Sequence, residues 1–388
     1  MRKKARDASE ILATLVGFDT VSRNSNLQLI DFVAEYLSAW GIEADVIADE
    51  AGGKANLFAT LGGPSDVPGI VLSGHTDVVP VDGQDWITDP FTMVEKDGRL
   101  FGRGTADMKG FLAICLALTP EIAAAKLREP IHVAFSYDEE VGCRGVHSMV
   151  EKISHRHPLP RACIIGEPTS MKVVTAHKGI CVYRTVIKGR EAHSSDTEFG
   201  VSANFAGGRL MEFLRNLLAE MKERGDDTGR FQPPYTTINV GSVTGGTAIN
   251  IIPNECTLTW EYRPLPQADD QEIINRFTEF AESEVLPEMQ ARFPDASITT
   301  EEIARAPALM RQQGSPAEEL VLALTGQNQT EAVSFATEGG IFQAADIPTV
   351  VCGPGSIEQA HRPNEFIALS ELDAGVGFVE KLVAALSD

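Results

Sequence analysis

The residues of this chain that could do chemistry lie in a few short segments, and most of them are acids or histidines. His75 and Asp77 fall in "VLSGHTDVV", just after an apolar run that is typical of a strand. Asp107 stands in "GRGTADMKG", just before an expected helix. Glu139 and Glu140 close "HVAFSYDEEVG", where three acids follow an apolar run. Buried carboxylates are costly unless a positive charge compensates them, so this loop is either solvated or holds a cation.

Two further segments complete the set. Glu167 follows an apolar run in "IIGEPT", and His361 stands in "GPGSIEQAHRPNEF". In open α/β sheets ligands bind beyond the carboxyl ends of strands, where these side chains are expected. Imidazole and carboxylate groups suit zinc, and cobalt suits them as well. There are too many ligands for one tetrahedral ion, and the set fits two ions that share a bridging carboxylate.

Each segment alone has an ordinary structural explanation. A single histidine is more often structural than a ligand, Asp107 could be a helix cap, and three acids in a row could be a solvated turn. The joint occurrence of all segments at strand ends is what indicates a metal site. His155 and His157 in "SHRHP" lie in a polar loop, and we expect them at the surface.

The elements that must position these residues alternate between strands and helices in the first half of the chain. Helical spacing of apolar residues predicts a helix over 27–37, and the Ala-rich segment 108–125 predicts a buried helix. Short apolar runs predict strands, some of them buried on both faces, and this alternation indicates a mostly parallel sheet covered by helices. The expected strands are 42–48, 55–62, 69–74, 131–137 and 162–168.

The pattern changes near residue 178, where half-exposed strands appear. The order strand, helix, strand, strand, helix, strand predicts an inserted α+β domain of the ferredoxin-like type. A helix near 316–325, a strand at 348–353 and a last helix beginning at Ser370 with Asp373 as capping box then return to the first pattern. The predicted domains are therefore 1–178 and 307–388 for the catalytic domain and 179–306 for the insert. The elements of the insert are expected at 178–189, 203–224, 235–246, 255–265, 270–293 and 296–306.

Composition excludes several classes of protein. The chain has 388 residues and a formal net charge of −22, which argues against binding to nucleic acid or to an anionic membrane surface. No apolar stretch approaches the roughly 20 residues that span a bilayer, and the basic start lacks the apolar region of a signal peptide. The six cysteines contain no C-x-x-C pair and are expected as buried thiols in a reducing cytoplasm.

The segments also resemble those of a known family. "SGHTDVVPV", "WITDPF", "GRLFGRGTADMKG", "SYDEEVG", "GEPT" and "EAHSS" are similar to signatures of the di-zinc metallopeptidases and amidohydrolases, which include acetylornithine deacetylase, succinyl-diaminopimelate desuccinylase, aminoacylase and the glutamate carboxypeptidases. The resemblance covers nearly the whole chain. "GGTAINIIP" and "GPGSIEQAHRPNEF" look most like the acetylornithine deacetylase branch.

The resemblance implies roles for the metal ligands. His75 binds one zinc ion and His361 the other, while Asp107 bridges both. Glu140 and Glu167 complete the two sites. A cis peptide bond between Asp107 and Met108 is also implied.

The resemblance implies the catalytic groups as well. Asp77 orients His75, and Glu139 is the general base that takes a proton from the attacking water and returns it to the leaving amine. His193 in "EAHSS" reaches the active site of a partner subunit and stabilises the oxyanion, although from the residues alone it is an exposed turn histidine. The protein is therefore expected to be a homodimer formed through the inserted domain.

Three residues are candidates for substrate contact. Arg263 in "EYRPL" could pair with an α-carboxylate, or be an ordinary surface arginine. Asn250 in "GGTAINIIP" could line the site, or serve only in a turn. Glu338 in "ATEGGIF" could face the side-chain ammonium of ornithine, although its segment departs from the T-E-A pattern of this branch.

The function implied is zinc-dependent hydrolysis of N2-acetyl-L-ornithine to L-ornithine and acetate, in the cytoplasm, as a step of arginine biosynthesis. The alternatives are another N-acyl-amino-acid deacylase or a succinyl-diaminopimelate desuccinylase, with the same chemistry and different pockets. A non-catalytic metal-binding relative is a remote alternative, since every ligand and the base are present.

Overall fold

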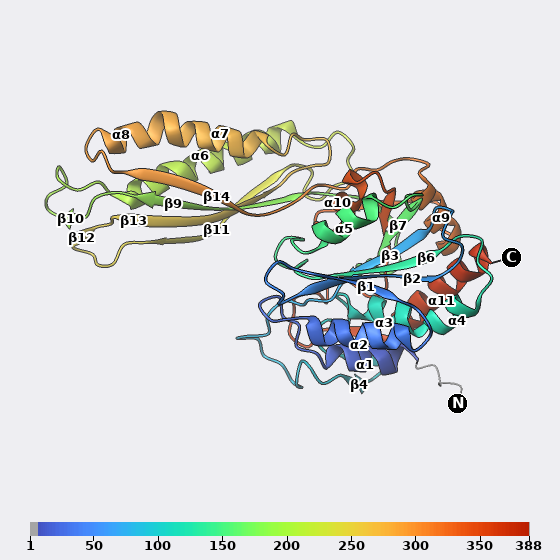
Figure 1. Ribbon diagram of the computed structural model, residues 1–388. Helices are drawn as coiled ribbons and strands as arrows, with labels where there is room; N and C mark the ends of the chain where they lie inside the picture. The colour runs from blue at the N-terminus through green and yellow to red at the C-terminus, as the bar shows by residue number, and fades with distance from the viewer. Residues whose placement is uncertain (1–6, 388) are drawn as a thin grey trace. The chain divides into compact units, whose positions relative to one another are not determined.

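The computed structural model describes residues 7–387, which form two compact units (Figure 1). The second unit comprises His177–Ala308 together with Val333–Ala336, and the first unit contains the other described residues. No helix within residues 7–387 is both long enough and apolar enough to cross a membrane.

The first unit is built on an eight-stranded sheet with a parallel centre. Its four central strands, β6, β3, β7 and β16, run parallel, while antiparallel pairs form the flanks. Every residue of β3, β6 and β7 is buried, because helices cover both faces of the sheet (Figure 1). The predicted α/β class is confirmed. In spatial order the strands are β1 (Ala44–Ala48), β2 (Ala55–Gly62), β6 (Ile131–Ser136), β3 (Ile70–His75), β7 (Ala162–Ile165), β16 (Thr349–Val351), β8 (Val174–His177) and β15 (Glu331–Val333).

The helices of this unit bury one apolar face each. Leu29, Ile30, Val33 and Leu37 are the buried residues of α2, at the spacing that predicted this helix. A small sheet of β4 (Val94–Lys96), β5 (Arg99–Phe101) and β17 (Phe366–Ala368) lies in the same unit. The helices are α1 (Ala8–Val16), α2 (Leu27–Ser38), α3 (Lys109–Ala117), α4 (Thr119–Ala124), α5 (Val146–Ser154), α9 (Pro316–Thr325), α10 (Gly339–Ala344) and α11 (Leu369–Leu386).

The second unit is an antiparallel sheet with helices on one face (Figure 1). Its sheet has the order β11-β13-β9-β14, and in β9 buried residues alternate with partly or fully exposed ones, as expected of a strand with one covered face. This is the arrangement that the split β-α-β-β-α-β pattern predicted. The elements are β9 (Ile180–Lys188), β10 (Ala192–His193), α6 (Ala203–Arg224), β11 (Thr237–Gly245), β12 (Ile251–Ile252), β13 (Glu255–Arg263), α7 (Glu272–Phe280), the π-helical turn η1 (Ala281–Val285), α8 (Leu286–Gln290) and β14 (Ser297–Ala306).

Three local predictions were wrong in detail. The helix expected over 108–125 is interrupted at Leu118, because Pro120 has no N–H and cannot continue the preceding turn. The helix expected over 270–293 contains η1 before Pro287. The last helix begins at Leu369 after Ala368, with no side-chain cap, so Ser370 is not its N-cap.

Candidate metal centre

Three neighbouring parallel strands deliver metal-binding residues to one edge of the large sheet. Strand β3 ends at His75, β6 ends three residues before Glu139, and β7 ends two residues before Glu167. Since β6, β3 and β7 are adjacent and parallel, their carboxyl ends meet at the same edge. Asp107 lies just before α3, and His361 comes from the loop between β16 and β17.

Asp107 stands between the two histidines. Its Oδ1 lies 3.1 Å from His75 Nε2, and its Oδ2 lies 3.5 Å from His361 Nε2. A second carboxylate accompanies each histidine: Glu167 Oε1 is 3.6 Å from His75 Nε2, and Glu140 Oε2 is 2.9 Å from His361 Nε2. The cluster therefore divides into two halves that share Asp107.

The orientation of His75 leaves one ring nitrogen for a metal ion. Its Nδ1 donates to the backbone oxygen of Asp77 at 2.9 Å, so Nε2 is the nitrogen left for a metal ion, and it faces Asp107. The carboxylate of Asp77 lies 3.6 Å from the same Nδ1. This arrangement is the usual way in which a neighbouring acceptor fixes the tautomer of a ligating histidine.

The carboxylate of Asp77 also holds the loop that carries two acids. Its Oδ1 accepts the backbone N–H of Glu139 at 3.1 Å, and its Oδ2 accepts the N–H of Glu140 at 3.3 Å. Ser22 Oγ donates to the same Oδ2 at 2.7 Å. Asp77 is 2% exposed, so these bonds form away from water. Nothing in the local sequence marked Ser22 for this position.

Asp138, the first of the three consecutive acids, has a structural partner. It forms an ion pair with Lys54, whose ammonium group also donates to the backbone oxygen of Ser22. Its φ of 56° places it in the left-handed region, which suits a turn residue. The three acids thus divide into one anchored by a lysine and two that face the histidines.

Glu139 lies within the same cluster. One of its carboxylate oxygens lies within 4.8 Å of donor atoms of both His75 and Glu167. The Cys143 thiol donates to its Oε1, with 3.4 Å between Sγ and Oε1. Burial raises the pKa of Glu139 to about 8, and the neighbouring Glu140 carboxylate adds to the effect. A carboxylate with this pKa is suited to accept and return a proton near neutral pH.

The electrostatics of the cluster fit a set of cations. Burial raises the pKa of Glu140 to about 7 and raises that of Glu167 well above its usual value. The hydrogen bond to Glu140 raises the pKa of His361 to about 9. Without metal ions, bound protons must therefore compensate the negative charge of these carboxylates. Two imidazole nitrogens and several carboxylate oxygens at these distances are donors that divalent ions such as zinc accept, so the residues fit two metal ions.

One buried residue that the sequence did not point to holds the Asp107 segment. Glu365 accepts the backbone N–H groups of Ala106 and Asp107 at 2.9 and 3.0 Å. The peptide bond between Asp107 and Met108 is cis, as the resemblance implied. Glu365 stands four residues after His361, and no local pattern distinguishes it from an ordinary loop glutamate.

The second unit contains three of the predicted residues. His193 is the last residue of β10, which pairs with β12, and Ser194 N donates to Asn250 O at 3.0 Å. This bond places His193 beside Asn250, and both residues are exposed. Arg263 ends β13, roughly 25 Å along the strand from that ribbon, and lies 3.2 Å from Glu261. The structure therefore does not bring Arg263 together with the other two.

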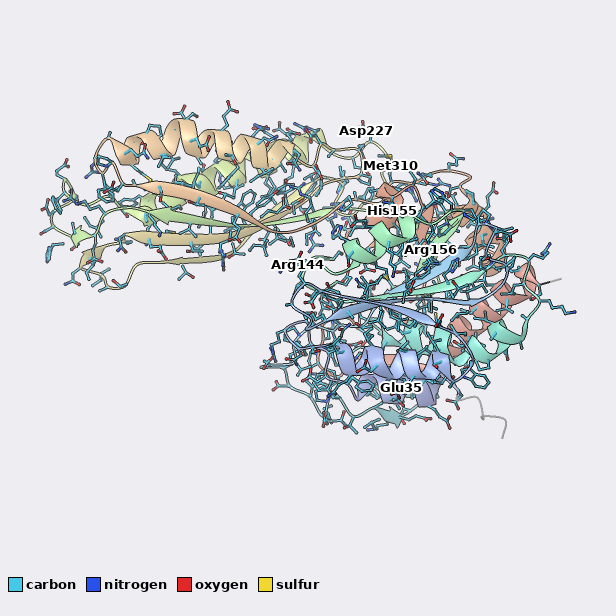
Figure 2. All side chains as sticks on the ribbon, in the orientation of Figure 1. Glu35, Arg144, His155, Arg156, Asp227 and Met310 are labelled. Carbon is cyan, nitrogen blue, oxygen red and sulfur yellow. The ribbon has the colours of Figure 1, made fainter. Side chains whose placement is uncertain are left out.

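Glu338 and the paired surface histidines complete the predicted set. Glu338 is 1% exposed, and its two carboxylate oxygens are buried without a hydrogen-bond partner in the described part of the chain. Burial raises its pKa to about 8. His155 and His157 are exposed, as expected, and neither joins a cluster of potential ligands within residues 7–387 (His155 is labelled in Figure 2).

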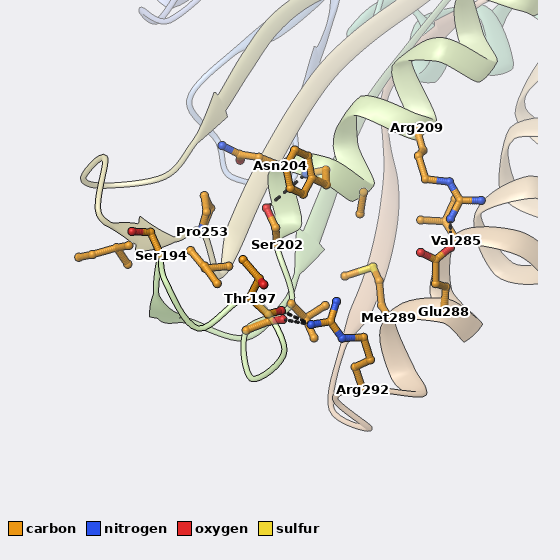
Figure 3. A pocket seen from close by; sticks show the side chains of 16 residues that line it. Ser194, Thr197, Ser202, Asn204, Arg209, Pro253, Val285, Glu288, Met289 and Arg292 are labelled. Carbon is orange, nitrogen blue, oxygen red and sulfur yellow. Dashed lines mark hydrogen bonds and ion pairs between the residues drawn. The ribbon is translucent and has the colours of Figure 1, made fainter.

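A cavity of about 500 Å³ lies elsewhere, within the second unit (Figure 3). It is bounded by α6, the β10–β12 ribbon and the segment η1–α8, and no predicted site residue lines it. Its arginines already have partners: Arg209 pairs with Glu288, and Arg292 donates to Gly200 O at 2.9 Å. The cavity therefore shows no free charged group that would identify a ligand.

Comparisons with known proteins agree with this geometry. The family model described as Peptidase family M20/M25/M40 matches residues 71–385. The chain is 36% identical over 365 residues to an acetylornithine deacetylase of Myxococcus xanthus, covering 93% of this chain and 92% of that protein. It is also 36% identical over 384 residues to an acetylornithine deacetylase of Photorhabdus laumondii, covering 97% and 93%.

Solved structures share the fold at low identity. An M20 family metallo-carboxypeptidase from Sulfolobus solfataricus superposes with a TM-score of 0.78 at 16% identity, over 97% of this chain and 98% of that one. A dinuclear metal binding peptidase of the M20 family from Bacillus subtilis gives a TM-score of 0.66 at 16% identity, over 98% and 97%.

Proposed function

The chain belongs to peptidase family M20/M25/M40, and from that membership we propose that it removes the acetyl group from N2-acetyl-L-ornithine. The reaction is the hydrolysis of a linear amide to ornithine and acetate, a step of arginine biosynthesis. The observation that carries the proposal is the position of Asp107, with one carboxylate oxygen toward each of two histidines. The enzyme is a metal-dependent amidohydrolase.

Two divalent ions would be held by five side chains. His75 and Glu167 would hold one ion, His361 and Glu140 the other, and Asp107 would contribute one oxygen to each. We propose zinc, with cobalt as the alternative, because both accept imidazole and carboxylate ligands. When bound, such ions polarise the amide carbonyl and lower the pKa of water.

Glu139 moves the proton in this mechanism. It accepts a proton from the attacking water and returns it to the nitrogen of the leaving amine, so that ornithine departs with a neutral amino group. Its half-buried position within 4.8 Å of a His75 donor atom supports this role, as does the anchoring of its N–H by Asp77. A loop held in this way keeps the carboxylate in place between the two transfers.

His193 would stabilise the oxyanion in the active site of a partner subunit, which makes the working protein a homodimer. Its Nδ1 is occupied by Ser195, whose backbone nitrogen lies at 3.2 Å and whose Oγ lies at 2.7 Å, so Nε2 is the ring nitrogen left for a partner. The exposed ring thus presents a donor, as an oxyanion requires. Exposed apolar side chains of the same unit support an interface between subunits: Phe205 is 82% exposed and Ile249 is 100% exposed.

Substrate recognition would involve further residues. Asn250, beside His193, would contact the substrate from the partner's inserted domain, residues 179–306. Glu338 would receive the side-chain ammonium of ornithine, which would give its buried carboxylate the partner it lacks. Arg263 would pair with the α-carboxylate, although its contact with Glu261 would have to open. All six cysteines are free and buried, which supports a cytoplasmic location.

The test is amide hydrolysis by the zinc-loaded protein. The substrates are N-acetylornithine, N-acetylcitrulline, N-acetylmethionine and N-succinyl-diaminopimelate, each measured with and without a chelator. A preference for N-acetylornithine that the chelator abolishes is expected. Equal rates on the acetylated substrates would identify a general aminoacylase instead, and a preference for the succinylated one a desuccinylase.

A further inference from the structure

A single buried carboxylate organises the backbone beside the bridging residue. Glu365 Oε1 accepts the N–H groups of Ala106 and Asp107, and Oε2 accepts the N–H of Gly104 at 3.0 Å. Arg103 Nη1 donates to the same Oε2 at 2.7 Å. Three backbone N–H groups within residues 104–107 are therefore bound by one side chain that stands 258 residues after Asp107.

Arg103 makes this arrangement possible. It is 1% exposed, as is Glu365, so the two charges neutralise one another away from water. Its guanidinium group also lies over the ring of Trp86, with 5.1 Å between Cζ and the ring centroid. Arginine suits this position because its planar fork can bond several acceptors at once, which an ammonium group cannot do in the same geometry.

The other contacts of Arg103 lead to His361. Its Nη1 donates to Arg362 O at 3.2 Å, and its Nη2 donates to Gln84 Oε1 at 2.6 Å. Gln84 Nε2 in turn donates to His361 O at 3.0 Å. His361 has a φ of 64°, in the left-handed region that residues other than glycine rarely adopt. Its backbone therefore depends on the surrounding hydrogen bonds to hold this conformation.

We propose that the Arg103–Glu365 pair is a positioning device for the half of the centre formed by His361, Glu140 and Asp107 Oδ2. The pair fixes the backbone of Asp107 on one side and that of His361 on the other, and so sets the distance between two ligands that the chain brings from far apart. The inference rests on the metal centre of the proposed function. None of these hydrogen bonds of Arg103 and Glu365 goes to a donor atom of the metal ligands, so both residues act through the segments they hold.

The experiment is calorimetric titration of the metal-free protein with Zn²⁺. Wild-type protein is expected to bind two ions per chain, and His361→Ala identifies the binding step that belongs to the His361 half. Glu365→Gln should weaken that step by roughly 10- to 100-fold, the usual effect of losing an outer partner of a ligand. Gln84→Ala removes the contact to His361 O and also the oxygen that accepts from Arg103 and Trp86, while the bonds of Glu365 remain. It should weaken the His361 step by at least roughly fivefold, the worth of one ordinary hydrogen bond.

Glu318→Gln is the matched control. Glu318 is also buried and bound to an arginine, Arg311, but none of its hydrogen bonds goes to a segment that carries a ligand. Glu318→Gln should leave the affinity of both zinc-binding steps unchanged. A loss of zinc affinity equal to that in Glu365→Gln would overturn the proposal. If Glu365→Gln does not fold, the zinc titration of Gln84→Ala tests the proposal instead. An unchanged His361 step in Gln84→Ala would also overturn the proposed role of the Arg103–Glu365 pair. A wild-type protein that binds two ions but leaves N-acetylornithine intact would overturn the proposed substrate and not this role.

Discussion

The carboxylate of Asp77 accepts the backbone N–H of Glu139 at 3.1 Å, across 62 residues of chain. The same carboxylate lies beside Nδ1 of His75. One side chain thus connects the strand end that supplies a metal ligand with the loop that supplies the proposed base. The orientation of the ligand and the position of the base therefore depend on a common group.

Replacement of Asp77 should affect both functions together. In Asp77→Ala the affinity for zinc should fall roughly 10-fold, the low end of the usual effect. His75 loses the carboxylate beside its Nδ1, while the backbone oxygen of residue 77 still accepts from that nitrogen. Activity at saturating zinc should also fall, because the N–H groups of Glu139 and Glu140 lose their acceptor. Ser22→Ala, which removes a single bond to Asp77, is the milder companion variant. Full activity of Asp77→Ala at saturating zinc would contradict the role given to this loop.

Glu139→Gln should abolish most of the activity and leave metal binding unchanged. The amide keeps the shape of the side chain but cannot accept the proton, so kcat should fall by roughly 10²–10⁴-fold. Steady-state kinetics and metal analysis of the same sample measure the two effects. Glu151→Gln, at an exposed glutamate of α5, is the control and should behave as wild type. Hydrolysis at the wild-type rate by Glu139→Gln would show that another group serves as base.

Binding of zinc should release protons at neutral pH. The pKa of Glu139 is raised to about 8 by burial, and that of His361 to about 9 by its bond to Glu140, so both groups hold protons at pH 7 in the metal-free chain. Zinc displaces them, and the release should fall toward zero by about pH 10, where the groups are already deprotonated. Titration calorimetry in buffers of different ionisation enthalpy measures the number released. A release that does not change between pH 7 and pH 10 would argue against this set of groups.

Glu338→Gln should change specificity more than catalysis. Loss of the carboxylate should lower kcat/KM for N-acetylornithine by roughly 10- to 100-fold, the worth of a hydrogen bond to a charged group. The value for N-acetylmethionine, which has no ammonium on its side chain, should stay near that of wild type. An equal fall for both substrates would mean that Glu338 supports the fold or the neighbouring loop and does not read the side chain.

One buried histidine of the first unit, His132, should oppose folding in acid although it is not part of the metal cluster. His132 lies in β6 and stacks on Phe58, and burial lowers its pKa to about 4. In the unfolded chain His132 therefore binds a proton near pH 6.5, whereas in the folded chain it does so only near pH 4. The contribution of His132 to the free energy of unfolding is present above pH 6.5 and is lost as the pH falls, by about 2 kcal/mol between pH 7 and pH 5.

Denaturant unfolding of the metal-free protein at pH 7 and pH 5 measures this loss. In His132→Gln the difference between the two pH values should shrink by that amount, whatever the variant does to stability at pH 7. The exposed His155 provides the control, since His155→Gln should keep the wild-type difference. An unchanged difference in His132→Gln would exclude this histidine as a cause of acid sensitivity.

Local sequence patterns were sufficient to predict a helix or strand wherever the segment's own side chains determine its structure. Helix α6 covers the predicted 203–224, because its apolar residues recur at helical spacing and Ser202 caps it by accepting the N–H of Phe205. Strand β2 covers the predicted 55–62 for the same kind of reason. The ligand residues were also identifiable, since potential ligands that follow apolar runs meet at the carboxyl edge of a parallel sheet.

The sequence by itself thus determined the class of fold, the order of elements and the residue types available for two metal ions. Only the tertiary structure decided which atoms face each other: that Asp107 divides its oxygens between His75 and His361, and that Glu365 and Arg103 hold the segments on which they stand. The reason is physical. Strand and helix patterns repeat over a few residues, whereas a buried ion pair between residues 262 positions apart leaves no trace in either local segment. Its partners become neighbours only when the core has closed around them.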